Sequence, residues 1–378
     1  MRRIARVCAA FLLCVFPFLC RGQAAPAQAP VPVQPAPGSS PGGADLTRLN
    51  AANPSNPASG DSTIHLDVRV TDRSGKPITG LALSDFSLLD NGQPGKILSF
   101  HAYESAAQRP DSPVQMVILF DTVNTDFNSV SFTRQQVDSF LLQNGGHLGA
   151  PTSIGWLKDD GISLQSEPSM DGNALAAQID AYVAGLRTLA RSAGVWGAIE
   201  RFQFSLRILD QIVQALGNKP GRKLVVWASP GWPALNGPGF TVSSKAQQEF
   251  FSEIVELSTR LRQGHIDLYS ISQGLPGPET YVYESYLKGV KKVSQADSPN
   301  LGLKVLAVQS GGLALPPSND LAAALNLCAR DADAFYSLSF EPPPADGPNE
   351  YHKLEVRIDK PGLTARTSSG YYGQPAAR

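Results

Sequence analysis

The chain has 378 residues, of which 42% are hydrophobic and 17% charged, so it is long enough for two domains with a substantial core. Its formal net charge of -1 excludes the strong positive field that draws a protein to nucleic acid or to an anionic membrane. Three of the four cysteines lie before residue 21, and only Cys328 lies beyond it. One cysteine excludes a disulfide framework and a cysteine-based metal cluster within the remaining chain.

Residues 1–24 have the pattern of a secretory signal peptide. A basic start precedes a short apolar run at 7–19, and small residues follow at 22–27. The run is too short for a good membrane span, so we expect no span in the mature chain. Cys20 leaves a lipoprotein signal open, although Leu19 stands where such signals have a small residue. We expect export to the periplasm, the cell surface or the extracellular medium.

The next two segments differ in their capacity to fold. Residues 25–60 are rich in Ala, Pro, Gly, Ser and Asn, and they are predicted to form a disordered tether because they cannot bury enough apolar surface. Residues 64–70 alternate apolar and polar side chains, as a half-buried strand does. Asn91-Gly92 then predicts a tight hairpin. About four strands within 62–105 are too few for an independent sandwich, so we expect the missing strands from elsewhere in the chain.

The central segment, residues 113–340, alternates strand and helix patterns. The apolar run at 114–120 predicts a strand buried on both faces, as in a parallel sheet covered by helices. Further predicted strands lie at 223–227, 266–271 and 334–340. Amphipathic helical patterns separate them, so we predict a mostly parallel sheet with helices on both faces.

The tail at 350–373 returns to strand patterns. Residues 352–358 alternate cleanly, and a second short alternating stretch follows at 363–367. These strands are predicted to complete the sheet begun at 62–105. The α/β segment is then an insertion into a split β-sandwich, because neither β segment alone is large enough to be stable.

Polar side chains follow directly after the strand at 114–120. Asp121 ends it, and Asn124, Thr125 and Asp126 come next. Open α/β sheets place their ligand sites at the carboxyl ends of the strands, so these oxygens are candidates for binding a cation. The alternative is that they only cap the next helix.

The order and spacing of these motifs resemble those of the von Willebrand factor A-related proteins abundant in acidobacteria. The similarity is carried by Phe120-Asp-Thr-Val-Asn-Thr125, by 220–233, by 335–340 and by the ending Gly370-Tyr-Tyr-Gly373. It covers residues 62–373. The resemblance implies a Rossmann-like von Willebrand factor A domain, inserted here in a small split β-sandwich.

In many such domains an Asp-x-Ser-x-Ser loop, a distant Thr and a distant Asp hold a divalent cation. By this resemblance Asp121 matches the first position and Thr125 replaces the second Ser. Val123 has no oxygen to offer, and Pro230 replaces the distant acid. The resemblance therefore implies a degenerate metal-ion-dependent adhesion site that binds Mg²⁺ or Ca²⁺ weakly or not at all, and we expect no other cofactor.

We therefore expect the residues after the strand at 114–120 to form a binding edge rather than a metal centre. Its members, besides Asp121 and Thr125, are Asn124, Asp126 and Ser229. We expect Asp121 to accept hydrogen bonds from loop N–H groups, which would hold the edge in shape.

Catalytic motifs give no support for an enzyme. The sequence has no His-Glu-x-x-His, no Walker loop and no Gly-x-Ser-x-Gly. Ser229 stands between a strand and a turn, but Pro230 lacks the backbone N–H that an oxyanion hole would use. We expect a secreted, non-catalytic module that binds an unknown protein partner at the cell envelope or outside. An extracytoplasmic hydrolase with an unrecognised site is the alternative, and a deep pocket with converging polar side chains would favour it.

Overall fold

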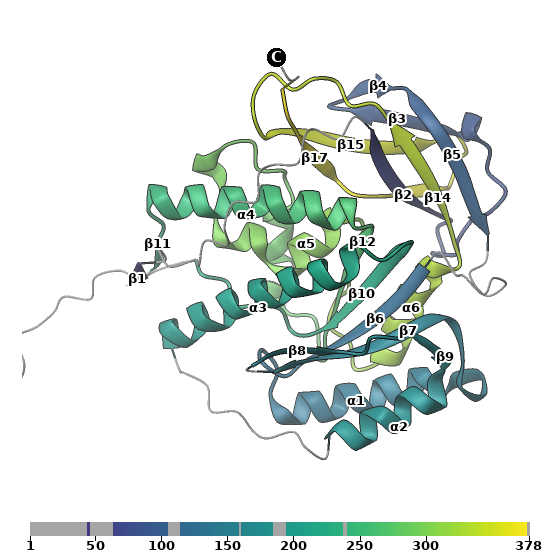
Figure 1. Ribbon diagram of the computed structural model, residues 1–378, viewed down its shortest axis with the longest axis vertical. Coiled ribbons are helices and arrows are strands. Elements are labelled where there is room, and N and C mark those ends of the chain that lie inside the picture. The colour runs from purple at the N-terminus through teal and green to yellow at the C-terminus, as the bar shows by residue number, and fades with distance from the viewer. Residues whose placement is uncertain are drawn as a thin grey trace, which may run out of the picture. The chain divides into compact units, whose positions relative to one another are not determined.

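The computed structural model describes residues 44–45, 63–104, 114–158, 160–183, 194–236 and 240–375. The predicted signal peptide lies outside the described residues, and so does the predicted tether except for Ala44–Asp45. These two residues form strand β1, which pairs in parallel with β11 (Phe240–Thr241). The rest contains one seven-stranded sheet and two four-stranded sheets (Figure 1). Among the described residues, no helix has the length and hydropathy that a bilayer span requires.

The seven-stranded sheet is mixed and mostly parallel. Its order is β13-β12-β10-β6-β7-β8, with β9 paired to β7 off this path. The strands are β6 (Val114–Asp121), β7 (His147–Lys158), β8 (Gly161–Leu164), β9 (Ser169–Asp171), β10 (Arg222–Ala228), β12 (Ile266–Ile271) and β13 (Leu313–Ala314). Only β8 and β9 run antiparallel to their neighbour. The chain winds from β6 to β7 in one direction and through β10, β12 and β13 in the other, which is the doubly wound order.

Helices cover both faces of this sheet (Figure 1). On one face lie α1 (Phe127–Leu141), α2 (Gly172–Val183) and α6 (Leu321–Ala329), and on the other α3 (Gly194–Gly217), α4 (Ser244–Gln263) and α5 (Leu303–Gln309). Successive side chains of β6 point to opposite faces, so Ile118 joins the α1 side and Leu119 the α3 side. This explains why the sequence of β6 is apolar without alternation. Cys328 is a free thiol fully buried in α6.

The two four-stranded sheets combine strands from both ends of the described chain. Their orders are β16-β2-β14-β5 and β17-β15-β3-β4. The strands are β2 (Ile64–Thr71), β3 (Phe86–Asp90), β4 (Gln93–Gly95), β5 (Ile97–Glu104), β14 (Ala334–Phe340), β15 (Glu350–Ile358), β16 (Thr364–Arg366) and β17 (Gly370–Gly373). β15 pairs with β3 and β16 with β2, which confirms the predicted pairing of the two terminal segments. One apolar cluster, including Leu66, Leu88 and Leu354, fills the space between the sheets and makes them a sandwich.

Short 3₁₀ helices complete the described elements. They are η1 (Leu83–Asp85), η3 (Gln143–Gly146), η4 (Pro278–Tyr286), η5 (Val293–Gln295), η6 (Ser298–Leu301) and η7 (Arg330–Ala332). Three of them, η4 to η6, lie in the long connection between β12 and α5. These elements confirm the predicted mostly parallel, Rossmann-like α/β sheet with helices on both faces, joined to a small split sandwich.

The strand at 334–340 is not where the sequence places it. The prediction puts it in the parallel sheet, but β14 pairs antiparallel with β2 and β5 inside the sandwich. Its two faces are both buried because Tyr336 and Leu338 point into the sandwich core, whereas Phe335 packs with the α1 side of the α/β sheet. An apolar run does not distinguish a strand between two domains from a strand inside a parallel sheet.

Candidate functional site

The candidate site lies where β6 and β10 end. These strands are parallel neighbours, with Phe120 in register with Ala228, so Asp121 and Ser229 come to the same edge. We call this the carboxyl edge, and the opposite end of the same strands the amino edge. The windings of the chain diverge between β6 and β10, which is where doubly wound sheets bind their ligands.

Asp121 is buried, with 1% of its surface exposed, and its carboxylate accepts four hydrogen bonds. Oδ1 accepts from the backbone N–H groups of Val123 (3.0 Å) and Asn124 (2.8 Å). Oδ2 accepts from Nδ2 of Asn124 (2.9 Å) and from Nε1 of Trp227 (3.0 Å). A carboxylate has about four lone-pair positions, so these donors occupy all of them. The expected bonds from loop N–H groups are confirmed.

Asn124 connects the loop to a helix. The same Nδ2 that donates to Asp121 also donates to Oγ of Ser205 on α3 (2.9 Å). Ser205 in turn donates to the backbone oxygen of Arg201 (2.8 Å). The amide of Asn124 therefore points into the protein and joins the carboxyl edge to the middle of α3.

The other predicted members of the edge have local structural contacts. Asp126 is exposed and caps α1: Oδ1 accepts from the backbone N–H of Ser129 (3.0 Å) and Oδ2 from its hydroxyl (2.7 Å). These bonds hold the pKa of Asp126 below its ordinary value. Ser229 is buried and accepts from the backbone N–H of Gly231 (3.2 Å), and Thr125 is buried as well. Asp126 therefore caps the next helix, which is the alternative to cation binding that the sequence left open.

This arrangement does not fit a divalent cation. N–H donors, which carry positive partial charge, surround the carboxylate of Asp121 where a cation would have to bind. The second carboxylate of the loop, Asp126, faces its own helix. Across the part of the chain that the structure describes, no group of three or more His, Cys, Asp or Glu side chains is placed to hold a metal. A hard dication needs about six oxygens, and the edge does not assemble them.

Calorimetry with Mg²⁺, Ca²⁺ and Mn²⁺ should therefore show no affinity tighter than about 1 mM, or about 4 kcal/mol. The physical reason is that binding would first have to break the four hydrogen bonds to Asp121. Asp126→Ala, in the same loop, serves as the matched variant. Micromolar binding that survives in Asp126→Ala and disappears in Asp121→Ala would show that the loop rearranges to hold a metal.

A buried charge cluster at the amino edge was missed by the sequence analysis. Its buried members are Arg69, Arg222, Tyr269, Asp267 and Asp331, and the half-buried Arg366 joins them. Oδ2 of Asp267 lies 2.8 Å from Nη1 of Arg69 and 2.6 Å from Nε of Arg222. The cluster therefore binds β2 of the sandwich to β10 and β12 of the α/β sheet.

Asp331 is the second carboxylate of the charge cluster. It accepts from the hydroxyl of Tyr269 (2.6 Å) and from Nη2 of Arg366 on β16. Burial alone would raise the pKa of Asp331, but the three guanidinium groups outweigh burial and hold it below its ordinary value. The one signal in the sequence is that two basic residues, Arg222 and Lys223, stand directly before the apolar run that begins at Leu224.

Comparisons with known proteins give distant structural likenesses only. No protein-family model and no curated protein matches the chain. The human COPII-coat protein Sec24c is similar with a TM-score of 0.33 and 9% identity, over 73% of this chain and 46% of that one. The TFIIH p34 N-terminal domain is similar with a TM-score of 0.23 and 12% identity, over 52% of this chain and 96% of that one. Both TM-scores are below 0.5, so the fold class rests on the strand order.

Proposed function

We propose that this protein is an exported, non-catalytic interaction module that presents its carboxyl edge to a protein partner. Export is supported by the signal-peptide pattern of residues 1–24. The observation that carries the binding proposal is the distribution of exposed apolar side chains. Six of the nine large exposed ones among the described residues lie on elements that start at or beyond the carboxyl edge: Phe127, Val195, Trp196, Leu275, Tyr281 and Val282.

Three elements bring these side chains to the edge. Phe127 is the first residue of α1, directly after the loop of Asp121, and Leu275 follows the end of β12. Ser205, in the middle of α3, contacts that loop. Trp196 in the first turn of α3 lies about 14 Å beyond Ser205 along the helix axis, at a rise of 1.5 Å per residue. Figure 1 shows α3 reaching past the end of β6. Trp196 is 68% exposed, and Trp and Tyr are the commonest anchors of protein interfaces.

The edge is preorganised, which favours binding because little conformational entropy is then lost on association. The bonds to Asp121 fix the first loop. The η4 segment is tied to the loop after β10, since Nδ2 of Asn236 donates to the hydroxyl of Tyr286 (3.1 Å). Nδ2 of Asn300 donates to the backbone oxygen of the same Tyr286 (3.4 Å).

Affinity capture from the native cell envelope with the mature chain tests this proposal. Trp196→Ala should weaken capture about tenfold or more, as loss of an aromatic anchor does. Leu98→Ala on the sandwich, also an exposed apolar residue, is the matched control and should capture normally. Chelation of divalent ions should leave capture unchanged. Equal capture by both variants, or capture lost on chelation, would contradict the proposal.

The residues that the structure describes give no observation that favours the hydrolase alternative. A hollow of 430 Å³ lies near the amino edge, between the end of α1, the start of β7 and α6. His147 and Asp333 line it, but no serine or cysteine does. The carboxyl edge has Ser229, whose hydroxyl accepts a bond from Gly231. We therefore retain the non-catalytic proposal.

A further inference from the structure

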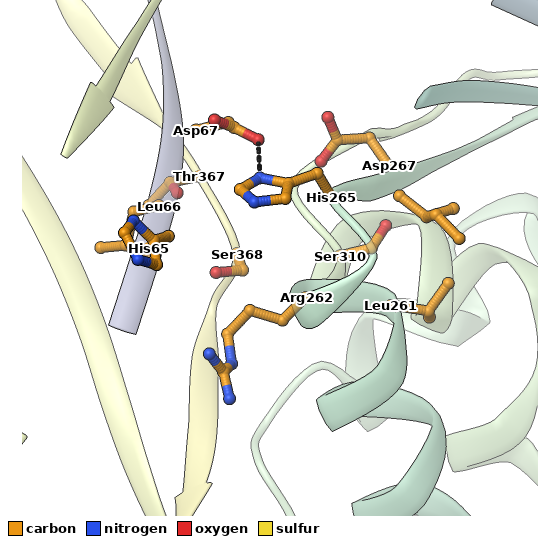
Figure 2. A pocket seen from close by; sticks show the side chains of 11 residues that line it. His65, Leu66, Asp67, Leu261, Arg262, His265, Asp267, Ser310, Thr367 and Ser368 are labelled. Carbon is orange, nitrogen blue, oxygen red and sulfur yellow. Dashed lines mark hydrogen bonds and ion pairs between the residues drawn. The ribbon is translucent and has the colours of Figure 1, made fainter. Parts of the chain in front are cut away.

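A histidine side chain of the α/β part contacts a carboxylate of the sandwich. His265 occupies the turn between α4 and β12, and its Nδ1 lies 2.8 Å from Oδ2 of Asp67 on β2 (Figure 2). The backbone of His265 has a φ of 49°, in the left-handed region, which costs a non-glycine residue about 1 kcal/mol. The side chain of Asp67 is 9% exposed and that of His265 is 35% exposed. The contact is thus half open to solvent.

A polar hollow adjoins this contact. It is lined from the sandwich by His65, Asp67 and Thr367 and from the α/β sheet by Arg262 and His265, among others (Figure 2). Its volume of 20 Å³ has room for about one water molecule. Water can therefore exchange protons with the ring of His265 without unfolding of the junction.

Charged and titratable groups face His265 from every neighbouring element. They are Asp67 and His65 from β2, Arg262 from α4, Lys223 from β10 and Asp267 from β12. Arg69 and Arg222 act on the other partner, Asp67. The ring of His65 lies 6.3 Å from that of His265, and the nearest carboxylate is that of Asp67. The positive side chains oppose protonation of the ring, and the two carboxylates favour it.

The balance favours the charged pair. The hydrogen bond that His265 donates to Asp67 raises the pKa of His265 above its ordinary value of 6.5, against burial and the charge of Lys223. Burial would raise the pKa of Asp67, but His265 and the guanidinium groups of Arg222 and Arg69 outweigh burial and hold it below 3.8. Both partners are therefore ionised from mildly acidic pH up to the raised pKa of His265.

Other ionic contacts across the same junction behave differently. Arg69 binds Asp267, and Arg366 binds Asp331. A guanidinium stays protonated at every physiological pH, so these pairs persist where the histidine titrates. We propose that His265 and Asp67 form a pH-dependent clamp between the sandwich and the α/β sheet, while the charge cluster keeps the two parts joined. The ion pair of the clamp is complete from mildly acidic pH up to pH 6.5 and is lost as the pH rises through the pKa of His265.

Hydrogen exchange of the full chain tests the clamp. After correction for the intrinsic rates, protection of β2 and of residues 265–271 should fall about twofold to fivefold between roughly pH 5.5 and 8.5, the range that a half-exposed ion pair supports. Asp67→Asn removes the charge and keeps an acceptor, so its protection should stay flat across this range. His65→Gln, on the same strand, is the control and should keep the wild-type dependence.

Titration of the His265 ring by NMR gives a second readout in the folded protein. Its pKa should fall toward the ordinary value in Asp67→Asn and stay raised in His65→Gln. His265→Gln replaces Asp67→Asn if the latter does not fold, and it should also abolish the pH dependence of exchange. The proposal is overturned if exchange in wild type does not depend on pH, or if the dependence persists in Asp67→Asn or His265→Gln.

Discussion

Asp267→Ala should lower the free energy of unfolding by about 3–5 kcal/mol, the usual cost of removing one partner from a buried ion pair. Asp267 is the shared acceptor of Arg69 and Arg222, whose side chains are almost fully buried. Without it, two guanidinium groups remain in a low-dielectric environment with one carboxylate fewer. The backbone oxygens of Gly311 and Asp331 still accept from these arginines, but they carry no full charge. Urea unfolding of wild type and variant measures the loss.

Glu355→Ala is the matched control. Glu355 pairs with Arg357 at 2.7 Å, a distance similar to those in the cluster, but the two side chains are 41% and 61% exposed. Water screens this pair, so its loss should change the stability far less than the loss of Asp267 does. A loss in Asp267→Ala no larger than in Glu355→Ala would show that the buried arginines find other partners.

The charge cluster also shows what cannot be inferred from the apolar/polar alternation of a strand. In β2 the sequence correctly separates Leu66 and Val68 from Asp67 and Arg69. Alternation identifies two faces of different polarity, but it does not say what covers the polar face. Here the α/β sheet covers Asp67 and Arg69, whose partners are about 200 positions away in the sequence. Pairings over such separations depend on tertiary packing, which local patterns do not encode.

At the carboxyl edge, too, contacts between residues close in sequence were predictable and contacts between distant residues were not. The position of Asp121 at the end of a buried strand, and its bonds to loop N–H groups two and three residues on, were predictable because both are local. The indole of Trp227, 106 positions away, was not predicted as its partner, although residues 223–227 were predicted to form a strand. Likewise the strand pattern at 334–340 was recognised and its sheet was not, since period and length do not specify the neighbour.

Asp121→Ala should destabilise the protein by about 3 kcal/mol, because it leaves buried donors without an acceptor and each such group costs about 1–3 kcal/mol, with incomplete additivity. The donors are two backbone N–H groups, the amide of Asn124 and the indole of Trp227. Asp121→Asn should destabilise the protein by nearly as much, because its NH₂ group would face the two N–H donors whose hydrogen bonds Oδ2 now accepts. Urea unfolding followed by tryptophan fluorescence measures both variants.

Asp126→Ala is the control that distinguishes the loss of the buried hydrogen bonds to Asp121 from the loss of a helix cap. Asp126 belongs to the same loop and is the same residue type, but it is exposed and its carboxylate caps α1 through Ser129. Loss of an N-cap side chain costs about 1 kcal/mol, so Asp126→Ala should be clearly more stable than Asp121→Ala. If both variants lose the same small amount, the carboxylate of Asp121 does not hold the edge. The preorganisation that supports partner binding would then have to come from η4 and α3 alone.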